Sequence, residues 1–539
     1  MLPQIAAARR GNTVFYLGKP LLSRIDPVSA SERIVESAMP AKERTLYFCP
    51  SPLFGYGLNH FVKTLPENSF VICVEATEAL AGWTRQNIDG AIFETPGAAL
   101  FLGGGVQALC RFVREKCGQR SFRRVEELRL SAGYALAAPL YDEMAGALRS
   151  VIALEWGNAM TLTKLGRLYI RNFLKNLHIL EASPALKSVN FGERPVLVAG
   201  AGPSLDMVLD ELLRHPKERL PEIVAVDTAL GALLRRKLRP SLVVALEAQH
   251  WNLADFCGWG GVPLRIAMDL SALPSVCRFA SHSLPYFFWT PWTELRLFER
   301  LKPALPLRLP PLGSVGLCAT ALALALSRGP VVVCGLDFAF SLERQHAKGT
   351  PSHISALRQL GRFSGLPAAR GVFQKGVFKV VSKTGSQLKS NAAMRRYMTL
   401  FKSEFASNPR VFELETEGVS LGARLLSLEA AAQMFSKAGS ACQNTEDILL
   451  NKSDCKPCGA DISALINYEK KLLGNIRSML TGALTADSAE LEALIDEADY
   501  LWAHFPECAA AGGRRPSAAN TSFLKRIRAE LDPMLELLN

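Results

Sequence analysis

The sequence lacks internal repeats and low-complexity tracts. Residues 1–13 carry two arginines but no apolar run after them, so we expect no signal peptide and a cytoplasmic protein. The longest uncharged stretch, Leu309–Ser327, is long enough to suggest a membrane helix, but its first half holds two prolines and a glycine. A buried helix fits this stretch better, and we expect no membrane span.

Metal-binding patterns are also scarce. No paired acidic DxD-like element follows a predicted strand of the central region, so nothing indicates a divalent ion that holds a pyrophosphate. The twelve cysteines are spaced irregularly, mostly inside apolar runs, which is typical of small buried side chains in a reducing compartment. Only Cys455 and Cys458 form a CxxC pair, with Cys442 as the sole nearby third ligand. We expect neither a metal nor another cofactor.

Length and charge set further bounds. A chain of 539 residues exceeds the roughly 250–300 residues that one hydrophobic core supports, so two to four domains are expected. The formal net charge is +12, and basic residues gather in Arg111–Arg129, Arg235–Arg239 and Lys375–Arg396. An anionic partner is favoured: nucleic acid, an anionic membrane surface and a nucleotide-sugar all fit, and so does a solvated basic face without a partner.

Residues 1–150 are expected to form an α/β N-terminal domain, followed by a helical connector over 151–190. Thr45–Cys49 and Phe70–Glu75 predict buried strands on either side of the glycine turn Phe54-Gly55-Tyr56-Gly57. This order is typical of a nucleotide-binding or methyltransferase-like half-fold, with Glu75 at the end of the second strand. It is also typical of any α/β layer, whether or not the layer binds a ligand.

Residues 191–438 alternate between apolar strand patterns and helical patterns more clearly than any other region. This alternation predicts the fold class as α/β, with a doubly wound, mostly parallel sheet in a Rossmann-like central domain. The predicted strands are Val196–Ala199, Ile223–Val226, Leu242–Leu246, Leu264–Met268, Pro285–Trp289 and Val331–Cys334. Residues 439–539 predict an all-helical C-terminal domain, with helices over Ile462–Leu480, Ala489–Phe505 and Phe523–Leu538, the second opened by the capping pair Asp487 and Glu490.

The first predicted strand of the central domain runs into a glycine turn, Gly200-Ala201-Gly202-Pro203-Ser204, that opens a helix. Gly200 and Gly202 let the backbone approach a ligand closely, while the free amides and positive end of the helix attract phosphate or carboxylate. Leu205 stands where a dinucleotide fingerprint needs a small residue, which excludes an NAD site. A tight turn without a ligand is the alternative.

Polar residues follow the next strands at the same edge of the sheet, where open α/β sheets bind ligands. Asp227 can accept a hydrogen bond from a ribose or a base, and Thr228 either contacts the ligand or caps the following helix. Glu247 should lie beside Asp227. A later turn at Gly313 and Ser314 opens a very apolar helix and offers another set of free amides, although plain helix capping explains it too.

The last predicted strand delivers Asp337 to this edge, and the polar loop after it carries His346 and His353. A histidine that titrates near neutrality can act as general base toward a hydroxyl. A loop histidine is also an ordinary surface residue.

Together these segments resemble the central domain of the motility-associated factor glycosyltransferases, which modify flagellin with pseudaminic- or legionaminic-type nonulosonic acids. The resemblance spans roughly 195–421. It rests on Gly200-Ala201-Gly202-Pro203-Ser204-Leu205, Val226-Asp227-Thr228, Gly313-Ser314-Val315 and Gly335-Leu336-Asp337-Phe338-Ala339-Phe340, with His346-Ala347-Lys348-Gly349 behind them. Phe54-Gly55-Tyr56-Gly57 is similar to the N-terminal domain of this family.

The central pattern is also similar to bacterial sialyltransferases that use CMP-sugars without a metal, which implies a GT-A-like, sialyltransferase-like catalytic domain. The resemblance implies that Gly202, Ser204, Asp227, Gly313 and Ser314 hold CMP and that His346, or else His353, takes the acceptor proton. Two residues depart from the relatives: Ala201 stands where the sialyltransferases tend to have asparagine, and Glu247 where flagellin-modifying relatives usually have aspartate.

The expected activity is therefore transfer of a nonulosonic acid from an anionic CMP-sugar to a serine or threonine of flagellin, as flagellar assembly and motility require. The expected partners are flagellin and the nucleotide-sugar, without nucleic acid; a homo-oligomer is compatible with the sequence. The alternatives are a diphosphotransferase similar to archaeal pterin pyrophosphokinases and a non-catalytic flagellin-binding protein.

Overall fold

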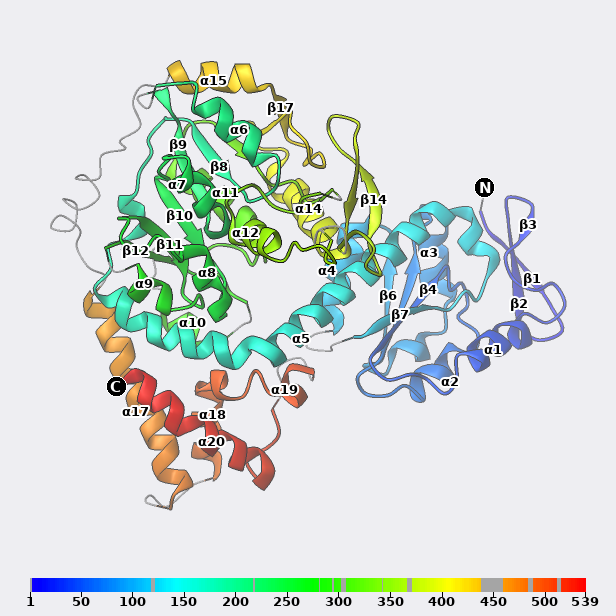
Figure 1. The fold of residues 1–539 in the computed structure, drawn as a ribbon. Coiled ribbons are helices and arrows are strands. Elements are labelled where there is room, and N and C mark those ends of the chain that lie inside the picture. Colours follow the sequence, from blue (N-terminus) through cyan, green and yellow to red (C-terminus); the bar gives the residue numbers. More distant parts are fainter. Residues whose placement is uncertain are drawn as a thin grey trace. The chain divides into compact units, whose positions relative to one another are not determined.

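The structure is a computed structural model that describes residues 2–117, 122–216, 219–280, 282–292, 295–301, 307–341, 343–365, 371–437, 459–482, 488–510 and 515–539. Contacts between residues divide the chain into two compact units. The smaller unit comprises Met1–Gly166 with Trp502–Ser517, and the larger comprises Arg167–Leu501 with Ala518–Asn539. Both are mixed α/β units built on a parallel sheet, as expected (Figure 1). None of the described helices combines the length and apolar character that a bilayer crossing requires.

The smaller unit contains a four-stranded parallel sheet in the order β6-β5-β4-β7. The two predicted strands are confirmed as β4 and β5, and every residue of both is buried. Alternate side chains of these strands pack on opposite faces, because successive residues of a strand point to opposite sides. The elements are β1 Gln4–Ala7, β2 Asn12–Tyr16, β3 Lys19–Pro20, α1 Pro27–Ser37, β4 Thr45–Pro50, α2 Leu58–Lys63, β5 Phe70–Glu75, α3 Glu78–Asn87, β6 Ala98–Leu102, α4 Val106–Cys117, β7 Arg124–Glu127 and α19 Pro506–Ala510.

Glu75, at the end of the strand that follows the glycine turn, has its hydrogen-bond partners within the smaller unit. Glu75, at the end of β5, is fully buried and accepts hydrogen bonds from the Ser51 hydroxyl at 2.8 Å, the Tyr141 hydroxyl at 2.9 Å and the Thr77 amide at 3.1 Å. Burial raises the pKa of this carboxyl. Glu75 therefore joins the ends of β4 and β5 to the start of the long helix α5, Ala138–Glu181.

The larger unit contains an eight-stranded parallel sheet in the order β12-β11-β10-β9-β8-β13-β16-β17. Within this sheet the chain begins at β8, proceeds strand by strand to β12 at one edge, and returns with β13 on the other side of β8. The boundary between β8 and β13 is a topological switch point, which is where open sheets of this kind bind ligands. The strands are β8 Val196–Ala199, β9 Glu222–Val226, β10 Leu242–Ala245, β11 Arg265–Asp269, β12 Leu284–Phe288, β13 Val331–Cys334, β16 Val411–Leu414 and β17 Arg424–Leu426.

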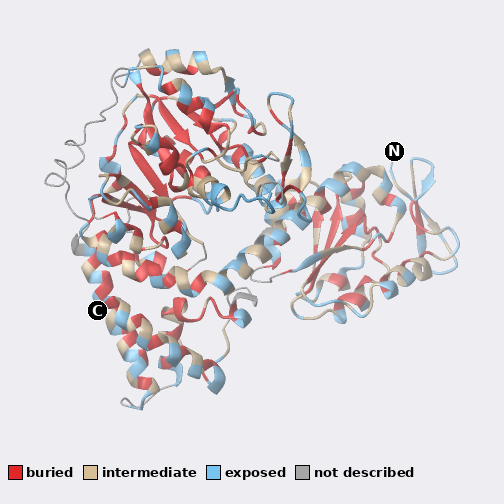
Figure 2. Cartoon of the chain, viewed as in Figure 1, coloured by how far each residue is buried: buried red, intermediate tan, exposed pale blue. Residues whose placement is uncertain are grey.

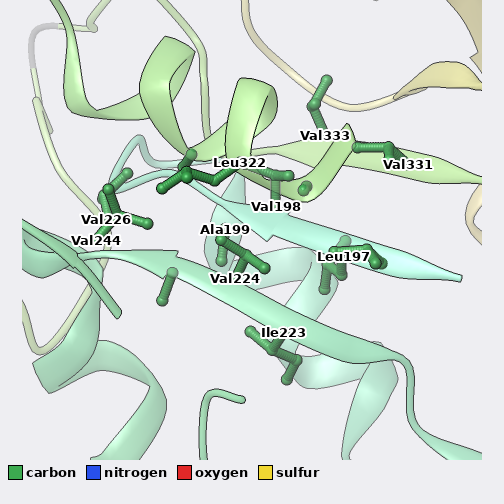
Figure 3. Close-up of a cluster of buried hydrophobic side chains, with 14 of the residues drawn as sticks. Leu197, Val198, Ala199, Ile223, Val224, Val226, Val244, Leu322, Val331 and Val333 are labelled. Atoms are coloured by element: carbon green, nitrogen blue, oxygen red, sulfur yellow. The ribbon is translucent and has the colours of Figure 1, made fainter. Parts of the chain in front are cut away.

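Helices cover this sheet and close a continuous apolar core. In Figure 3 valines and leucines of β8, β9 and β13 meet Leu322 of α11, the buried helix expected within Leu309–Ser327. Figure 2 shows the same strands as the most completely buried part of the unit. The helices are α6 Leu205–Leu212, α7 Leu230–Arg235, α8 Leu253–Phe256, α9 Ser275–Phe279, α10 Arg296–Leu301, α11 Val315–Leu326, α12 Pro351–Arg358, α14 Ala392–Phe405 and α15 Leu428–Lys437.

The C-terminal part is helical where it is described, with α17 Gly459–Leu480, α18 Ser488–Glu497 and α20 Thr521–Leu538. The single helix predicted over Ala489–Phe505 is wrong beyond Glu497: a 3₁₀ turn follows at Asp499–Leu501. There the Asp499 carboxylate accepts the amide of Arg296 at 2.9 Å, which anchors the turn on α10. Cys442, Cys455, Cys458 and the proposed cap Asp487 lie outside the described residues.

Candidate active site

The glycine turn after β8 packs backbone to backbone against the end of β13. A Cβ at Gly200 would lie less than 3.0 Å from the carbonyl oxygen of Gly335, and a Cβ at Gly335 would lie equally close to the carbonyl of Gly200. Gly335 also has φ +64°, a conformation that side chains rarely adopt. These two glycines therefore allow the two strand ends to approach each other at the switch point.

The amides of this turn are occupied within the chain. The Gly202 amide donates to the Gly335 carbonyl at 2.8 Å, and the Ser204 amide donates to Asp337 Oδ2 at 2.9 Å. The Ser204 hydroxyl donates to the other oxygen of Asp337. The expectation of free phosphate-binding amides at Gly200, Gly202 and Ser204 is wrong in this respect, because the Asp337 carboxylate takes the position at the start of α6 that a phosphate would take.

The Asp337 side chain therefore connects the segment after β13 to the start of α6. Its side chain is buried, and burial raises its pKa to about 6 although both oxygens accept hydrogen bonds from Ser204. The sequence suggested a catalytic role for this carboxyl. In the structure Ser204 donates to both of its oxygens, so these contacts join β13 to α6, and a catalytic role of Asp337 stays a prediction.

The two predicted anion-binding turns lie on either side of one side chain. A Cβ at Gly200 and a Cβ at Gly316 would both meet a methyl group of Leu336, so this leucine fills the space between the first turn and the start of α11. Leu336 therefore separates the two turns at this point, although the resemblance implies that residues of both hold CMP. The hydroxyl of Ser314, the N-cap residue of α11, makes no capping bond, and the described residues supply no partner for the amides of Val315 and Gly316.

Two aromatic residues border the start of α11. Tyr397 of α14 lies 3.6 Å from a Cβ placed at Gly313, and its ring lies 6.3 Å from that of Phe338. Phe338 has φ +45°, which is rare for a bulky residue, and its carbonyl accepts the Ser390 hydroxyl at 2.8 Å. Such strain at the end of a parallel strand is common at functional sites. The free amides of α11 thus face a rim built from the ends of β13 and α14.

Asp227, buried at the end of β9, shares one amide with the half-buried Asp255 of α8. Asp227 accepts the Thr228 amide at 2.8 Å and the Asn252 side-chain amide at 2.7 Å, and the same Asn252 nitrogen reaches Asp255 at 3.3 Å. Burial raises the pKa of Asp227 to about 6 and that of Asp255 to about 7. Thr228 does not cap α7, since its hydroxyl donates to Asp227. Asn252 Oδ1 stays without a partner among the described residues.

Glu247 follows β10 and is exposed, and its charge raises the pKa of Asp227, as expected for neighbouring strand ends. The same charge acts on Tyr169 of α5, whose pKa burial raises to about 12. Asp269 and Tyr397 also contribute to the shift at Tyr169. Side chains from the ends of β10 and β11, from α5 and from α14 therefore surround one polar region at the carboxyl edge of the sheet.

The loop that carries His346 is fastened to the glycine turn. The Ala347 amide donates to the Ala201 carbonyl at 2.9 Å. Asp206, in the first turn of α6, accepts the Lys348 amide at 3.0 Å and forms ion pairs with Arg344 at 2.7 Å and Arg236 at 2.9 Å. This network holds His346 beside the switch point, next to the end of β8.

Both candidate histidines line one pocket of about 390 Å³, between α8, α12 and the loop after Glu343. His353 lies in the first turn of α12, so its expected place in the loop is wrong; its Nδ1 accepts the Gly349 amide at 3.3 Å. His346 is half-buried, and burial lowers its pKa. A lowered pKa keeps the imidazole neutral at physiological pH, as a general base requires.

Sequence reasoning missed several residues that shape this region. Asn172 and Asn176 of α5 are buried and donate to the backbone carbonyls of Ala248, Ser271, Leu270 and Ala272, between 2.8 and 3.0 Å. The i, i+4 spacing of two asparagines on an otherwise apolar helix face was a signal for such a contact. Asp206 also had a signal, since an acidic residue in the first turn of a helix suits the helix dipole.

The larger unit is thus an open parallel α/β sheet with polar residues gathered at a switch point. A family model described as 6-hydroxymethylpterin diphosphokinase MptE-like matches residues 169–343, which include β8 through β13. An uncharacterized protein of Treponema pallidum (strain Nichols) is 28% identical over 561 residues, covering 100% of this chain and 95% of that protein. A solved Maf glycosyltransferase from Magnetospirillum magneticum AMB-1 has a similar fold, with a TM-score of 0.53 at 14% identity over 100% of this chain and 91% of its own.

Proposed function

We propose that this protein is a glycosyltransferase that moves a nonulosonic acid of the pseudaminic or legionaminic type from a CMP-sugar to a serine or threonine of flagellin. The observation that carries the proposal is the fastening of the His346 loop to the glycine turn, by the Ala347–Ala201 hydrogen bond of 2.9 Å. It puts a neutral imidazole at the switch point of a sheet whose fold is similar to that of a Maf glycosyltransferase.

In this proposal the start of α11 receives the phosphate of the donor. The amides of Val315 and Gly316 and the hydroxyl of Ser314 have no partner among the described residues, and the helix dipole favours an anion there. Asp227, Thr228 and Glu247 lie at the neighbouring strand ends for the ribose or the base. Gly200, Gly202, Ser204 and Asp337 build the turn that supports these groups.

The reaction is a direct displacement. The acceptor hydroxyl attacks the anomeric carbon while the imidazole of His346 accepts its proton. The bond from that carbon to the phosphate oxygen breaks, and its electron pair leaves with CMP. Preorganised amides at α11 stabilise the charge that grows on the phosphate, a role for which one such donor contributes about 3 to 4 kcal/mol.

A second activity is supported by the match to the pterin diphosphokinase model, which includes the same switch point. That reaction would transfer diphosphate from ATP to a hydroxymethyl pterin. The two activities require different substrates, so one pair of assays separates them.

The test combines purified protein, unmodified flagellin and a CMP-activated pseudaminic or legionaminic acid, followed by intact-mass measurement of flagellin. We expect one sugar mass to be added for each modified residue, and His346→Ala to slow the addition by about 10² to 10⁴-fold. A parallel reaction with ATP, Mg²⁺ and 6-hydroxymethylpterin tests the second activity. Unchanged flagellin mass together with formation of pterin diphosphate would overturn the glycosyltransferase proposal, whereas binding of flagellin without either reaction would favour a non-catalytic protein.

A further inference from the structure

The net positive charge of this protein originates in one segment. From Arg344 to Ser403 the chain contains twelve lysines and arginines and no aspartate or glutamate. The whole sequence has 62 basic and 50 acidic residues, so the remaining chain is neutral, with 50 of each. We call residues 344–403 the basic segment. Such a separation of charge in one continuous stretch marks a surface for an anionic partner.

The basic segment borders the candidate site. It begins at the loop that holds His346, continues through α12 and includes the hairpin of β14 Phe378–Val381 and β15 Gln387–Ser390, followed by α14. Backbone hydrogen bonds of 2.8 and 2.9 Å join Phe340, after β13, to Lys389 of the hairpin. The hairpin therefore lies beside the segment that follows β13.

Several of these cations form no ion pair with a described residue. Arg344 pairs with Asp206 and Lys383 with Glu413. Elsewhere in the described part of the basic segment, a set of exposed side chains forms no ion pair with any described residue: Arg358, Arg362, Lys375, Lys379 and Arg395. These exposed cations outnumber the two negative charges of a CMP-nonulosonic acid, one on the phosphodiester and one on the carboxylate.

Apolar side chains are exposed among the same cations. Phe363 is 96% exposed, Phe373 is 81% exposed and Leu357 is 52% exposed. The Arg362 guanidinium lies 5.7 Å from the ring centre of Phe363. Arginine beside exposed aromatic rings is typical of the energetically important residues of protein interfaces.

We propose that the basic segment docks an acidic, partly apolar surface of the protein acceptor and so presents its hydroxyl to His346. The inference rests on the proposed function, because a transferase that modifies a protein must hold that protein beside its base. Charge complementarity selects an acidic surface, and the exposed phenylalanines favour a folded protein surface. An anionic bilayer or a nucleic acid would use the same cations, and the experiment separates these partners.

The experiment compares two charge-reversal variants with the unmodified protein. The first, Arg358→Glu/Arg362→Glu/Lys375→Glu, changes three exposed cations of the basic segment that do not line the histidine pocket. The matched control, Lys471→Glu/Lys525→Glu/Arg528→Glu, makes the same change of charge at exposed positions of the C-terminal helices. The assays measure KM for flagellin, KM for the CMP-sugar and release of CMP without acceptor.

We expect the first variant to raise KM for flagellin about tenfold at low salt, with the difference shrinking to about twofold near 0.5 M NaCl, because salt screens exposed charges. The control should change KM for flagellin by less than about twofold. KM for the CMP-sugar and the release of CMP without acceptor should also change by less than about twofold in both variants. An unchanged KM for flagellin in the first variant would overturn the proposal. So would an equal rise in the control, which would indicate only the overall charge.

A direct binding measurement keeps the test independent of turnover. Fluorescently labelled flagellin, vesicles with about one third phosphatidylglycerol and a single-stranded RNA are titrated against the three proteins at low salt. If no CMP-sugar is turned over, weaker flagellin binding by the first variant alone still supports docking while the proposed function fails. Absence of flagellin binding by the unmodified protein overturns docking, as does a selective loss of vesicle or RNA binding with flagellin binding intact.

Discussion

The contact between Gly200 and Gly335 allows a quantitative test of what these glycines do. Three alanine substitutions separate two effects. Gly385→Ala, in the β14–β15 turn, introduces a side chain at φ +84° into open space. Gly200→Ala introduces a clash with the Gly335 carbonyl in an ordinary backbone conformation, and Gly335→Ala combines a clash with the Gly200 carbonyl and φ +64°. Gly385→Ala therefore measures the cost of the positive φ, Gly200→Ala measures the cost of the clash, and Gly335→Ala measures the two costs together.

The expected magnitudes follow from these geometries. A positive φ costs an alanine about 1 to 2 kcal/mol relative to glycine. A Cβ forced into a backbone oxygen in a packed region costs about 1 to 3 kcal/mol, since neither strand end can move freely. We therefore expect about 1 kcal/mol for Gly385→Ala, about 2 kcal/mol for Gly200→Ala and about 3 kcal/mol, the sum of the two costs, for Gly335→Ala.

Hydrogen exchange measured by mass spectrometry is the appropriate assay, because a chain with two compact units has no single free energy of unfolding. Peptides from β8 and β13 should exchange roughly thirtyfold faster in Gly200→Ala, as about 2 kcal/mol implies, and faster still in Gly335→Ala. In Gly385→Ala these peptides should be unchanged. The reasoning is refuted if Gly200→Ala leaves exchange in both strands unchanged but abolishes CMP-sugar binding, which would show that the glycine faces the ligand.

Three further predictions concern single groups. His346→Ala should lower the kcat of flagellin modification by about 10² to 10⁴-fold, and because burial lowers the pKa of this imidazole, the acid limb of kcat/KM should fall below pH 6.5. Asp227 has a pKa of about 6 in the folded protein against 3.8 in the unfolded chain, so its ionisation destabilises the fold. Protection of β9 from hydrogen exchange, corrected for the intrinsic exchange rate, should therefore decline as the pH rises from about 4 to 7. The Asp227→Asn substitution should remove this pH dependence. Arg300→Leu should destabilise the docking of α17 by about 3 to 5 kcal/mol, measured as faster exchange in α17, because it leaves the fully buried Glu469 without its partner at 2.7 Å.

Strands with continuous apolar runs were predictable. β5, β8 and β13 begin and end where the sequence predicted, since polar or turn residues bound each run of buried residues. β16 was not predicted, because Val411–Leu414 contains Glu413; this carboxylate is buried, and accepts the Leu421 amide at 2.9 Å and pairs with Lys383 at 3.5 Å. A charged residue inside a buried strand is compensated by contacts that lie elsewhere in the chain.

In the candidate site, too, contacts between distant parts of the chain could not be predicted from the sequence. The residues around the switch point could be selected from sequence because parallel strands deliver their following residues to one edge. The group that accepts the Ser204 amide at the start of α6 could not be predicted, since Asp337 lies 133 residues further along the chain. Local spacing predicts that a helix begins and that its first amides need acceptors, but whether a ligand or another part of the chain supplies them depends on tertiary packing.

This internal occupation bears on which donor the site can hold. In dinucleotide-binding folds the first helix of the sheet receives a pyrophosphate, but here a carboxylate already neutralises that helix start, and a second anion beside it would be repelled. The start of α11 offers one separate set of amides across Leu336. One helix start suits a single phosphodiester, the only phosphate of a CMP-sugar, better than the extended triphosphate of ATP. Replacing Asp337 with asparagine should therefore leave donor preference unchanged if α11 binds the phosphate, whereas a gain of ATP binding would place the anion site at α6.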